Sequence, residues 1–525
     1  MICASAAFAH LERTTVLSYW TLVAIASAIT AVIVVHVAQT LYEWLRMWWY
    51  LRDVPKVKPK KSFSLIIDMY KQIAAMDPSL DMKVRCFNYL RGMFKSIADQ
   101  DVTVAYYGPY PFLVACTPET VESVLTNPEN VDRSFFYSML KPWVGGGMLT
   151  LSGEAWRSRR KVVKPGYHFR ILEGYIPILN KRGERLMKKV ASMGDEFFNM
   201  IPIARAASLG VLLETTMGVD YDDEIERVQY LKTHDAISDS VTKRAAKFHN
   251  WFDSIYAFTA ECKEMKRHIE KANNFIDTIL EKRLADYKKG IRDPISSNVF
   301  LEILLRMWAE EGTLTKIDVR DECTAMLIGG FDPTANKIAH TLHLLGLHPE
   351  AQAKVHGEID LVCGEGLDTP ITNEELKDLT YMDCVLKEAL RLYPPVPVVS
   401  RTLRKDISIG KYTIPRGTVG FVALYFLQRN PRFYEDPDAF KPERFMDPKL
   451  AHTFAFAPFS GGARSCLGQK FSMMQAKILL THILRRFEVT SKIPMNDLVM
   501  TSDFILKPVQ GLEIKLTPRR HPAAS

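Results

Sequence analysis

The chain has few cysteines for its length, and none of them is spaced for a metal site or for a disulfide framework. Its 525 residues include eight cysteines, and no two show the short CxxC spacing of zinc ligands. They are also too sparse for the scaffold of a small secreted protein, which indicates reduced thiols facing the cytosol. A zinc-stabilised domain and a disulfide-stapled one are therefore both disfavoured.

The chain also lacks a concentrated block of charge. Its 68 basic and 60 acidic residues leave a formal net charge of +8, and the basic residues are spread out apart from clusters at 56–61 and 157–164. No nucleic-acid-binding motif accompanies these clusters, so they favour a solvated or membrane-facing surface, and we expect no nucleic-acid partner. With 47% hydrophobic and 24% charged residues, the composition is that of a globular protein with a large core.

Charge is missing altogether between Arg13 and Glu43. An apolar helix of this length can cross a bilayer of about 30 Å, whereas a buried soluble helix or the core of a cleaved signal peptide is usually shorter. Aromatic residues of the kind found at membrane interfaces follow it, and the basic excess lies on its C-terminal side, which places the rest of the chain in the cytosol. These flanking residues are Trp44, Trp48, Trp49 and Tyr50, then Arg46, Arg52, Lys56, Lys58, Lys60 and Lys61.

The sequence predicts three segments. Residues 1–52 form a membrane anchor, residues 53–62 form a basic linker stiffened by Pro55 and Pro59, and residues 63–525 form one catalytic body. The body has no repeat or low-complexity tract. A strand near 111–116 is followed by a helix capped by Thr117, a second β-rich patch covers 398–424, and long amphipathic helices lie between them. The fold class predicted is mainly α with small β-sheets (α+β).

One predicted helix carries residues that helices usually avoid. It begins at the capping box Thr315–Asp318 and ends at His348–Pro349, so it is roughly 50 Å long. Gly329, Gly330 and Pro333 stand at its centre, where each glycine costs about 1 kcal/mol relative to alanine and the proline about 3 kcal/mol. We expect the helix to open its hydrogen-bond ladder there for a functional reason; the alternative is a plain proline kink at a packing contact.

The stretch FSGGARSCLG, residues 459–468, surrounds one cysteine with flexible backbone and a fixed positive charge. Glycines 461, 462 and 468 allow close backbone approach and positive φ. An apolar 3.6-residue periodicity follows, which places Cys466 just before a helix N-terminus, where the helix dipole favours a thiolate. A lone cysteine is commonly an inert core residue, but this combination favours a thiolate that binds a metal.

Two further motifs carry charge. Glu388 and Arg391 lie three residues apart on a helix that Pro394 and Pro395 end. On local evidence alone they form a surface ion pair of little energetic value. Their apolar neighbours instead indicate burial, and a buried pair would need a further partner such as Arg444 of the PERF stretch.

Together these motifs resemble the cytochrome P-450 superfamily over essentially all of the chain after the anchor. The cysteine loop fits the specific signature FxxGxRxCxG, Glu388 and Arg391 fit its ExxR helix, and PERF supplies Arg444. GEAWRSRRKVVKPGYHFRIL, ETTMG at 214–218 and RRFEV at 485–489 are similar to the clan of family four, which contains fatty-acid and xenobiotic hydroxylases. The signature positions are Phe459, Gly462, Arg464, Cys466 and Gly468.

The resemblance implies a cytochrome P-450 fold that holds haem b, with Cys466 as the axial thiolate ligand of iron. Trp156 and Arg160 match the family's WxxxR pair for a haem propionate, and Arg401 and Arg464 are further propionate partners by position. Glu388, Arg391 and Arg444 brace the fold behind the haem. Electrons come from NADPH–cytochrome P-450 reductase on the basic face, with cytochrome b5 as a further donor, and the anchor indicates a single-pass protein of the endoplasmic reticulum membrane.

The central helix departs from the family pattern. The acid of the motif is present as Asp332, but Pro333 replaces the threonine that normally helps to deliver protons to dioxygen, and Thr334 fills only the second position. Proton delivery must therefore use Asp332 with ordered water, or a displaced Thr334. Many members of the clan bind haem through an ester to a glutamate at the position of Gly329, so we expect the haem here to be held non-covalently.

The function predicted is a membrane-bound monooxygenase that hydroxylates a lipophilic substrate: a fatty acid, a hormone-like lipid or a xenobiotic. Pro333 motivates a second hypothesis, a haem-thiolate isomerase or peroxide-rearranging enzyme that needs no NADPH. The third is a haem protein that binds lipid without turnover. The segments 130–150 and 225–260 are expected to line the pocket, with aromatic candidates at Phe135, Phe136, Trp143, Phe248 and Trp251. The sequence does not determine the substrate.

Overall fold

The structure is a computed structural model of the whole chain. It describes residues 2–57, 64–107, 110–221, 223–292, 295, 299–364, 366–447 and 452–519. Half of the predicted basic linker, residues 58–62, lies outside the described residues.

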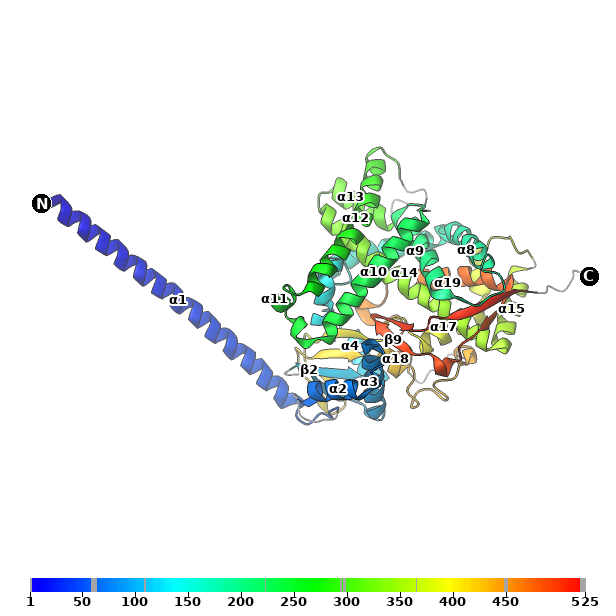
Figure 1. The fold of residues 1–525 in the computed structure, drawn as a ribbon, viewed down its shortest axis with the longest axis horizontal. Coiled ribbons are helices and arrows are strands. Elements are labelled where there is room, and N and C mark those ends of the chain that lie inside the picture. Colours follow the sequence, from blue (N-terminus) through cyan, green and yellow to red (C-terminus); the bar gives the residue numbers. More distant parts are fainter. Residues whose placement is uncertain are drawn as a thin grey trace, which may run out of the picture.

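The N-terminal segment is one long helix, α1 (Ile2–Leu51), which projects from the end of the body (Figure 1). Its part from Trp20 to Leu51 is long and apolar enough to cross a membrane and contacts little of the body along most of its length. Helix α9 (Met200–Met217) passes the same test, but it is mostly buried against the central helix and is therefore a core helix. The predicted anchor is thus present as a candidate membrane span.

The last turns of α1 are bound to the body. The Arg46 guanidinium lies 2.6 Å from the Asp406 carboxylate, and Arg416 lies 2.6 Å from Glu43. Leu51 and Val54 then enter a small apolar core beside the first sheet. Because the ion pairs and this core act on the same end of the helix, the body is held in a defined orientation to the anchor.

The body is mainly helical, as the composition and periodicity predict. Several of its helices cross the centre of the body (Figure 1). The α-helices after α1 are α2 (Ser64–Ala75), α3 (Met82–Ser96), α4 (Pro118–Thr126), α5 (Lys141–Val144), α6 (Gly153–Val163), α7 (Phe169–Gly174), α8 (Ile176–Ala191), α9, α10 (Glu224–Ala246), α11 (Asp253–Tyr256), α12 (Ala260–Lys288), α13 (Phe300–Ala309), α14 (Lys316–Leu347), α15 (Pro349–Cys363), α16 (Asn373–Asp378), α17 (Thr380–Leu392), α18 (Leu424–Leu427) and α19 (Gln469–Leu484). Short 3₁₀ turns are η1 (Phe135–Leu140), η2 (Lys164–Tyr167), η3 (Phe248–Trp251), η4 (Pro442–Phe445), η5 (Thr453–Ala455), η6 (Gly462–Arg464) and η7 (Met495–Asp497).

The strands form four small sheets, as expected for the predicted α+β class. The largest has the order β1-β2-β7-β4, in which β2 and β7 run parallel and the other neighbours antiparallel. The others pair β5 with β6, β9 with β10, and β11 with both β3 and β8. The strands are β1 (Thr103–Tyr107), β2 (Tyr110–Ala115), β3 (Phe198–Asn199), β4 (Val399–Thr402), β5 (Ile407–Ile409), β6 (Tyr412–Ile414), β7 (Val419–Val422), β8 (Phe487–Ser491), β9 (Met500–Asp503), β10 (Ile505–Pro508) and β11 (Glu513–Pro518).

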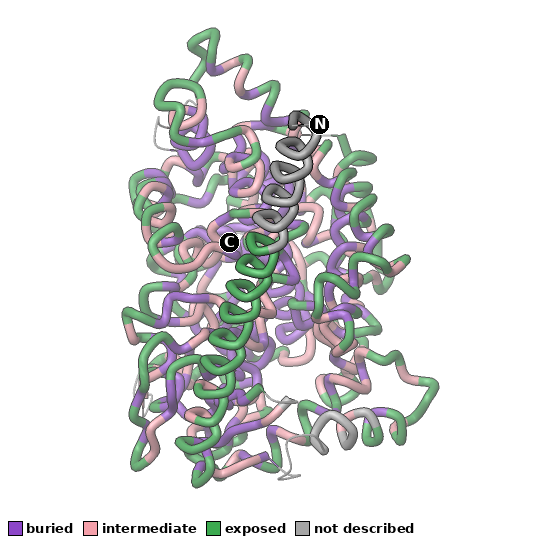
Figure 2. The backbone as a smooth tube through the Cα atoms, turned by 90° about the vertical axis from the view of Figure 1, so that its left-hand side faces the viewer, coloured by how far each residue is buried: buried purple, intermediate pink, exposed green. Residues whose placement is uncertain are grey.

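Helix α14 runs through the centre of the body and is buried along most of its length. The part of α1 from Trp20 onward is mostly exposed (Figure 2). The N-terminus of α14 shows the predicted capping box, because Thr315 and Asp318 bond reciprocally. It remains helical from Lys316 to Leu347, with Pro333 inside it. The helix is therefore continuous through the glycines and the proline, and the expected opening of its hydrogen-bond ladder is absent. Pro333 has no N–H to donate to that ladder.

The two central glycines have different surroundings. A Cβ on Gly330 would come within 2.6 Å of the Leu212 side chain, so this glycine lets α9 pack closely on α14. A Cβ on Gly329 would meet nothing within 4 Å. Gly330 therefore serves packing, whereas Gly329 leaves space beside the helix.

Candidate active site

The cysteine loop packs its backbone tightly against α4. The Cys466 N–H donates to the Phe459 carbonyl at 2.9 Å, which folds the loop back on itself. Gly462 has φ +66°, and a Cβ there would lie 1.9 Å from the Leu125 carbonyl oxygen, so only glycine fits. Gly468 differs from the expectation, because its φ of −84° is ordinary and it serves as the N-cap of α19.

The sulfur of Cys466 faces the interior. Burial raises the pKa of its thiol, whereas a hydrogen bond from the Gly468 N–H and the charges of Lys337 and Arg160 act to lower that pKa. The residue nevertheless keeps accessible surface, and of the described free cysteines it alone is exposed. A residue that stays accessible while protein surrounds its thiol this closely lines an internal space, which is where a large planar ligand would bind its axial donor.

Four arginines converge near this loop. Arg401 is 1% exposed and Arg464 is 6% exposed, and Arg160 donates to the Ser465 carbonyl at 2.8 Å. Arg133, which the sequence analysis missed, joins them, because its charge acts on both Arg401 and Arg464. None of the four has a carboxylate within 4 Å among the residues that the structure describes.

These cations lack a balancing anion. Burial, together with repulsion from Arg133, lowers the pKa of Arg401 to about 9, and burial with repulsion from Arg133 and Arg401 lowers that of Arg464 to about 8. A guanidinium stays protonated in proteins, so the lowered pKa values measure how unfavourable these buried charges are without an anion. Arg464 also lies 4.3 Å over the centroid of Trp156. The cluster fits an anionic ligand such as the two propionates of a porphyrin.

Glu388, Arg391 and Arg444 form the buried cluster that the apolar neighbours predicted, and the surface ion pair suggested by local evidence is wrong. Glu388 and Arg391 are both 0% exposed and are joined by two hydrogen bonds of 2.7 and 2.8 Å. Arg444 Nε lies 3.4 Å from Glu388 Oε1. Arg391 also donates to carbonyls of the segment that leads to the cysteine loop, at Gln428, Pro437 and Ala439.

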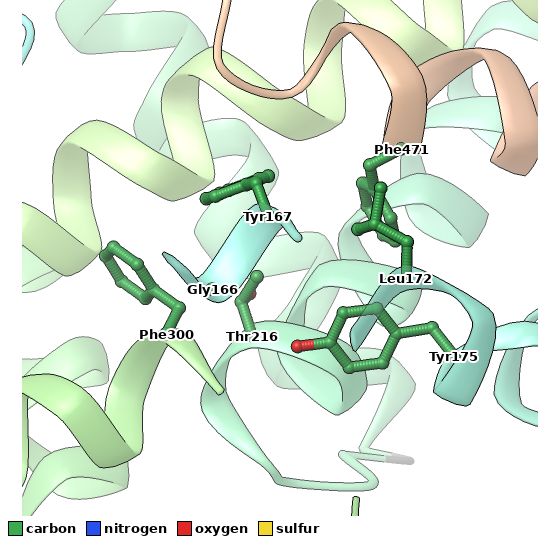
Figure 3. A pocket seen from close by; sticks show the side chains of 7 residues that line it. All are labelled: Gly166, Tyr167, Leu172, Tyr175, Thr216, Phe300 and Phe471. Carbon is green, nitrogen blue, oxygen red and sulfur yellow. The ribbon is translucent and has the colours of Figure 1, made fainter. Parts of the chain in front are cut away.

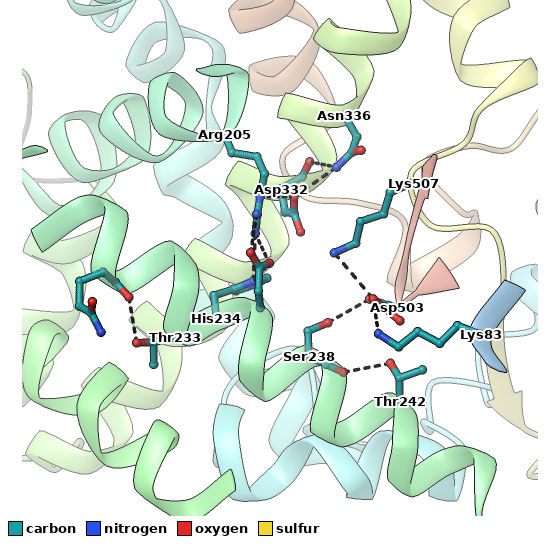
Figure 4. Close-up of polar contacts among 12 residues, drawn as sticks. Lys83, Arg205, Thr233, His234, Ser238, Thr242, Asp332, Asn336, Asp503 and Lys507 are labelled. Carbon is teal, nitrogen blue, oxygen red and sulfur yellow. Dashed lines mark hydrogen bonds and ion pairs between the residues drawn. The ribbon is translucent and has the colours of Figure 1, made fainter. Parts of the chain in front are cut away.

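Asp332 and Thr334 point from α14 toward different neighbours. The Asp332 carboxylate is 2% exposed, lies 3.0 Å from Arg205 Nε of α9 and accepts a hydrogen bond from Asn336 (Figure 4). The Thr334 hydroxyl instead lies 2.9 Å from the Ser472 hydroxyl of α19. The structure therefore does not bring the two predicted catalytic side chains together.

Arg205 links Asp332 to the surface. It lies 2.6 Å from the Asp235 carboxylate of α10 and 3.3 Å from His234 Nδ1 (Figure 4). Burial acts to raise the pKa of Asp235, but hydrogen bonds from His234 and Arg205 hold that pKa well below its usual range. The Asp235 side chain is 43% exposed. No local sequence signal marked Arg205 or Asp235, because they meet Asp332 only through helix packing.

Four of the five aromatic residues predicted to line the pocket form one cluster. The rings of Phe135 and Phe136 of η1 contact each other in a tilted arrangement, with 4.1 Å between their centroids, and each lies 5.0 Å from Trp251 of η3. Phe248 lies 5.2 Å from Trp251. Trp143 lies elsewhere, with its ring 5.0 Å from His234.

A separate small pocket lies behind the cysteine loop, between η2, α7, α9, α13 and α19 (Figure 3). Its walls are mainly aromatic, with Tyr167, Tyr175, Phe300 and Phe471 around it. It is a packing gap far too small for a porphyrin, and it contains none of the arginines described above. We therefore place the functional site at the accessible face of Cys466.

Comparison with known proteins identifies this site. The family model described as Cytochrome P450 matches residues 81–515. The chain belongs to the cytochrome P450 family. Cytochrome P450 4V2 of Mus musculus is 34% identical over 517 residues, covering 96% of each chain. Cytochrome P450 4c3 of Drosophila melanogaster is 33% identical over 454 residues, which is 82% of this chain and 85% of that protein. The family-four resemblance is confirmed.

Membership in the cytochrome P450 family makes the protein a haem-thiolate monooxygenase. Its cofactor is haem b, whose iron is bound by a cysteine thiolate. The accessible cysteine before α19, the open face at Gly329 and the arginines without carboxylate partners fit this group.

Proposed function

We propose that this protein is a membrane-anchored monooxygenase that hydroxylates lipophilic substrates, with Cys466 as the ligand of the haem iron. The observation that carries the proposal is that the residue Cys466 stays accessible near buried arginines without carboxylate partners among the described residues. Haem supplies the activation of dioxygen once electrons arrive. The anchor, residues 1–52, the linker, residues 53–62, and the haem domain, residues 63–525, form the three parts of the chain.

The protein's own residues hold the cofactor and its ligand. Gly468 donates its N–H to the sulfur, and such a donor moderates the electron donation of a thiolate. Trp156, Arg160, Arg401 and Arg464, together with Arg133, would hold the propionates of haem, while Phe459 and Gly462 shape the loop. Glu388, Arg391 and Arg444 hold the segment before the loop in place. The missing ester acceptor at Gly329 supports a non-covalent haem.

Asp332 lies in the middle of α14 and is held there by its ion pair with Arg205, which also pairs with the exposed Asp235. A guanidinium stays protonated, so Arg205 orients Asp332 and does not itself relay a proton. The space that the structure leaves beside Gly329 lies next to this part of α14. We assign proton delivery to Asp332. Thr334, which the sequence analysis named beside it, is bonded to Ser472 on another face of the helix.

The substrate class follows from the surroundings of the site. The aromatic cluster at Phe135, Phe136 and Trp251, which the sequence predicts to line the pocket, supports an apolar substrate, and the anchor would hold the body near a bilayer from which such molecules partition. Lys161, Lys164 and Lys470 are exposed, and Lys470 lies four residues after Cys466. They suit an acidic electron donor, for which we propose NADPH–cytochrome P-450 reductase, with cytochrome b5 as a second donor, at the endoplasmic reticulum membrane.

The decisive experiment combines spectroscopy with product analysis. The full chain, reconstituted with the reductase in vesicles, is given NADPH and a panel of fatty acids and xenobiotics. We expect hydroxylated products, and a dithionite-reduced carbon monoxide complex with the red-shifted Soret band of thiolate ligation. Cys466→Ser should abolish that band. Turnover of a lipid hydroperoxide without NADPH, with no hydroxylation, would instead support the rearranging enzyme that Pro333 motivates.

A further inference from the structure

Helix α14 carries a buried lysine close to the cysteine loop. Lys337 is 2% exposed, although lysine is among the residues least often buried. Its Nζ donates to the Ser472 carbonyl and to the Ser472 hydroxyl, both at 2.7 Å. It also lies 5.9 Å from the centroid of the Phe459 ring, at the start of the loop. Lys337 thus joins α14 to the first turn of the helix that follows Cys466.

The geometry of α14 places this lysine on a different face of the helix from Asp332. Asp332 and Asn336 are four residues apart and share the face that meets Arg205. Thr334 and Lys337 are three residues apart and share the face that meets Ser472. One helix therefore presents a carboxylate to the surface network on one face and an ammonium toward the cysteine loop on another.

Lys337 has no carboxylate to balance its charge. No acidic oxygen lies within 4 Å of its Nζ among the residues that the structure describes. Asp383 of α17 acts on it electrostatically, and this carboxylate is already shared by Lys387 at 2.8 Å and Lys477 at 3.4 Å. The other negative group that acts on it is Cys466, whose electrostatic effect on the pKa of Lys337 is larger than that of Asp383.

Burying an ammonium group costs desolvation free energy unless an anion nearby compensates the charge. Burial lowers the pKa of Lys337 to about 7, whereas the charge of Cys466 acts to raise it. A thiolate on iron remains anionic, so it is the compensating charge that the surroundings of Lys337 otherwise lack.

We propose that Lys337 is a positioning residue of the haem site, which holds a positive charge within electrostatic range of the Cys466 thiolate and so raises the reduction potential of the iron. The inference rests on the proposed role of Cys466. Reduction adds one electron, which the reductase supplies, and lowers the net charge of the centre by one. A fixed cation nearby stabilises the reduced state more than the oxidised state and weakens electron donation by the sulfur.

The competing explanation is a mechanical clamp. The two hydrogen bonds to Ser472 would hold α14 and α19 together whether or not their donor carried a charge. A neutral side chain that still donates, such as glutamine, would preserve much of a clamp but none of the electrostatic effect. The two explanations therefore differ in what Lys337→Gln does.

The test is a spectroelectrochemical titration of the haem-loaded full chain. We expect Lys337→Met and Lys337→Gln to lower the equilibrium constant for reduction about tenfold, which is about 59 mV for a one-electron couple. Both should keep the thiolate Soret band of the reduced carbon monoxide complex. Lys337→Arg should retain most of the wild-type potential. The matched control is Lys316→Met, which removes a charge from the exposed start of the same helix, where Lys316 pairs with Glu281, and should leave the potential unchanged.

The outcomes separate the two proposals. A potential in Lys337→Met and Lys337→Gln that equals the Lys316→Met value would overturn the electrostatic role. A second outcome would also overturn it: Lys337→Met loses haem, whereas Lys337→Gln keeps its haem and has the wild-type potential. That is the behaviour expected of a mechanical clamp. Loss of haem from both variants would also count against it, because a charge that only sets the potential is not needed to hold the cofactor. A wild-type protein without the thiolate Soret band would instead overturn the assignment of Cys466.

Discussion

Glu388→Gln removes the only negative charge from the buried cluster behind the site and leaves the shape of the side chain almost unchanged. Glu388 and Arg391 are 0% exposed, and Glu388 also lies 3.4 Å from Arg444 and accepts from the Lys441 N–H at 2.9 Å. The variant leaves Arg391 charged and without a carboxylate. Breaking a buried ion pair in this way costs about 3–5 kcal/mol, a large share of the roughly 5–15 kcal/mol that stabilises a typical protein.

The assay is urea denaturation of the haem-loaded protein, followed by the Soret band and by far-UV circular dichroism, with the haem content of purified material as a second measure. The matched control is Glu443→Gln. Its pair with Lys354 is exposed, so its loss should cost about 0–1 kcal/mol. Replacing both Glu388 and Arg391 by methionine should cost less than Glu388→Gln alone, because no unpaired charge remains. Equal stability of Glu388→Gln and Glu443→Gln would refute the claim that the buried pair holds the segment before the cysteine loop.

Three further predictions follow from the site. Pro333→Thr restores a hydroxyl next to Asp332, and we expect it to raise the fraction of NADPH that ends in product; an unchanged ratio of product to NADPH would show that the hydroxyl does not limit proton delivery. Acidified organic solvent should extract all haem from the protein, as measured by the spectrum of the residual pellet, because Gly329 offers no carboxylate for an ester. Burial lowers the pKa of His482 from 6.5 to about 4, so the fold prefers the neutral ring while the unfolded chain takes up a proton. The contribution of His482 to stability should therefore fall by about 3 kcal/mol at most as the pH drops from about 6.5 toward 4. His482→Gln should remove this part of the pH dependence in urea titrations at pH 7 and 5, while the buried His340 and His343 keep theirs.

Features that depend on neighbours in the sequence were predictable. The uncharged run after Arg13 predicted a long helix, and the capping box placed the start of α14. Gly462 has the positive φ that was predicted for it. The periodicity after Gly468 located α19 and so placed Cys466 before its N-terminus. Each of these rests on local backbone preference, helix periodicity or hydropathy, which a few adjacent residues settle.

Features that depend on contacts between distant segments could not be predicted from the sequence. Nothing in the neighbourhood of Arg133 separates it from a surface arginine. For Glu388 and Arg391 the apolar neighbours indicated burial, but the carbonyl partners of Arg391 at Gln428, Pro437 and Ala439 appear only in the tertiary structure. Pro333 was expected to break the helix, yet packing of α9 and α19 on α14 keeps it continuous.

The sequence by itself determined the family, the anchor and the cysteine. Only the tertiary structure decided that Asp332 meets Arg205, that Thr334 turns to Ser472, and that Lys337 brings its charge toward Cys466. The reason is physical: local interactions choose the conformation of a segment, whereas the value of a charge depends on burial and on partners that lie more than a hundred residues away along the chain.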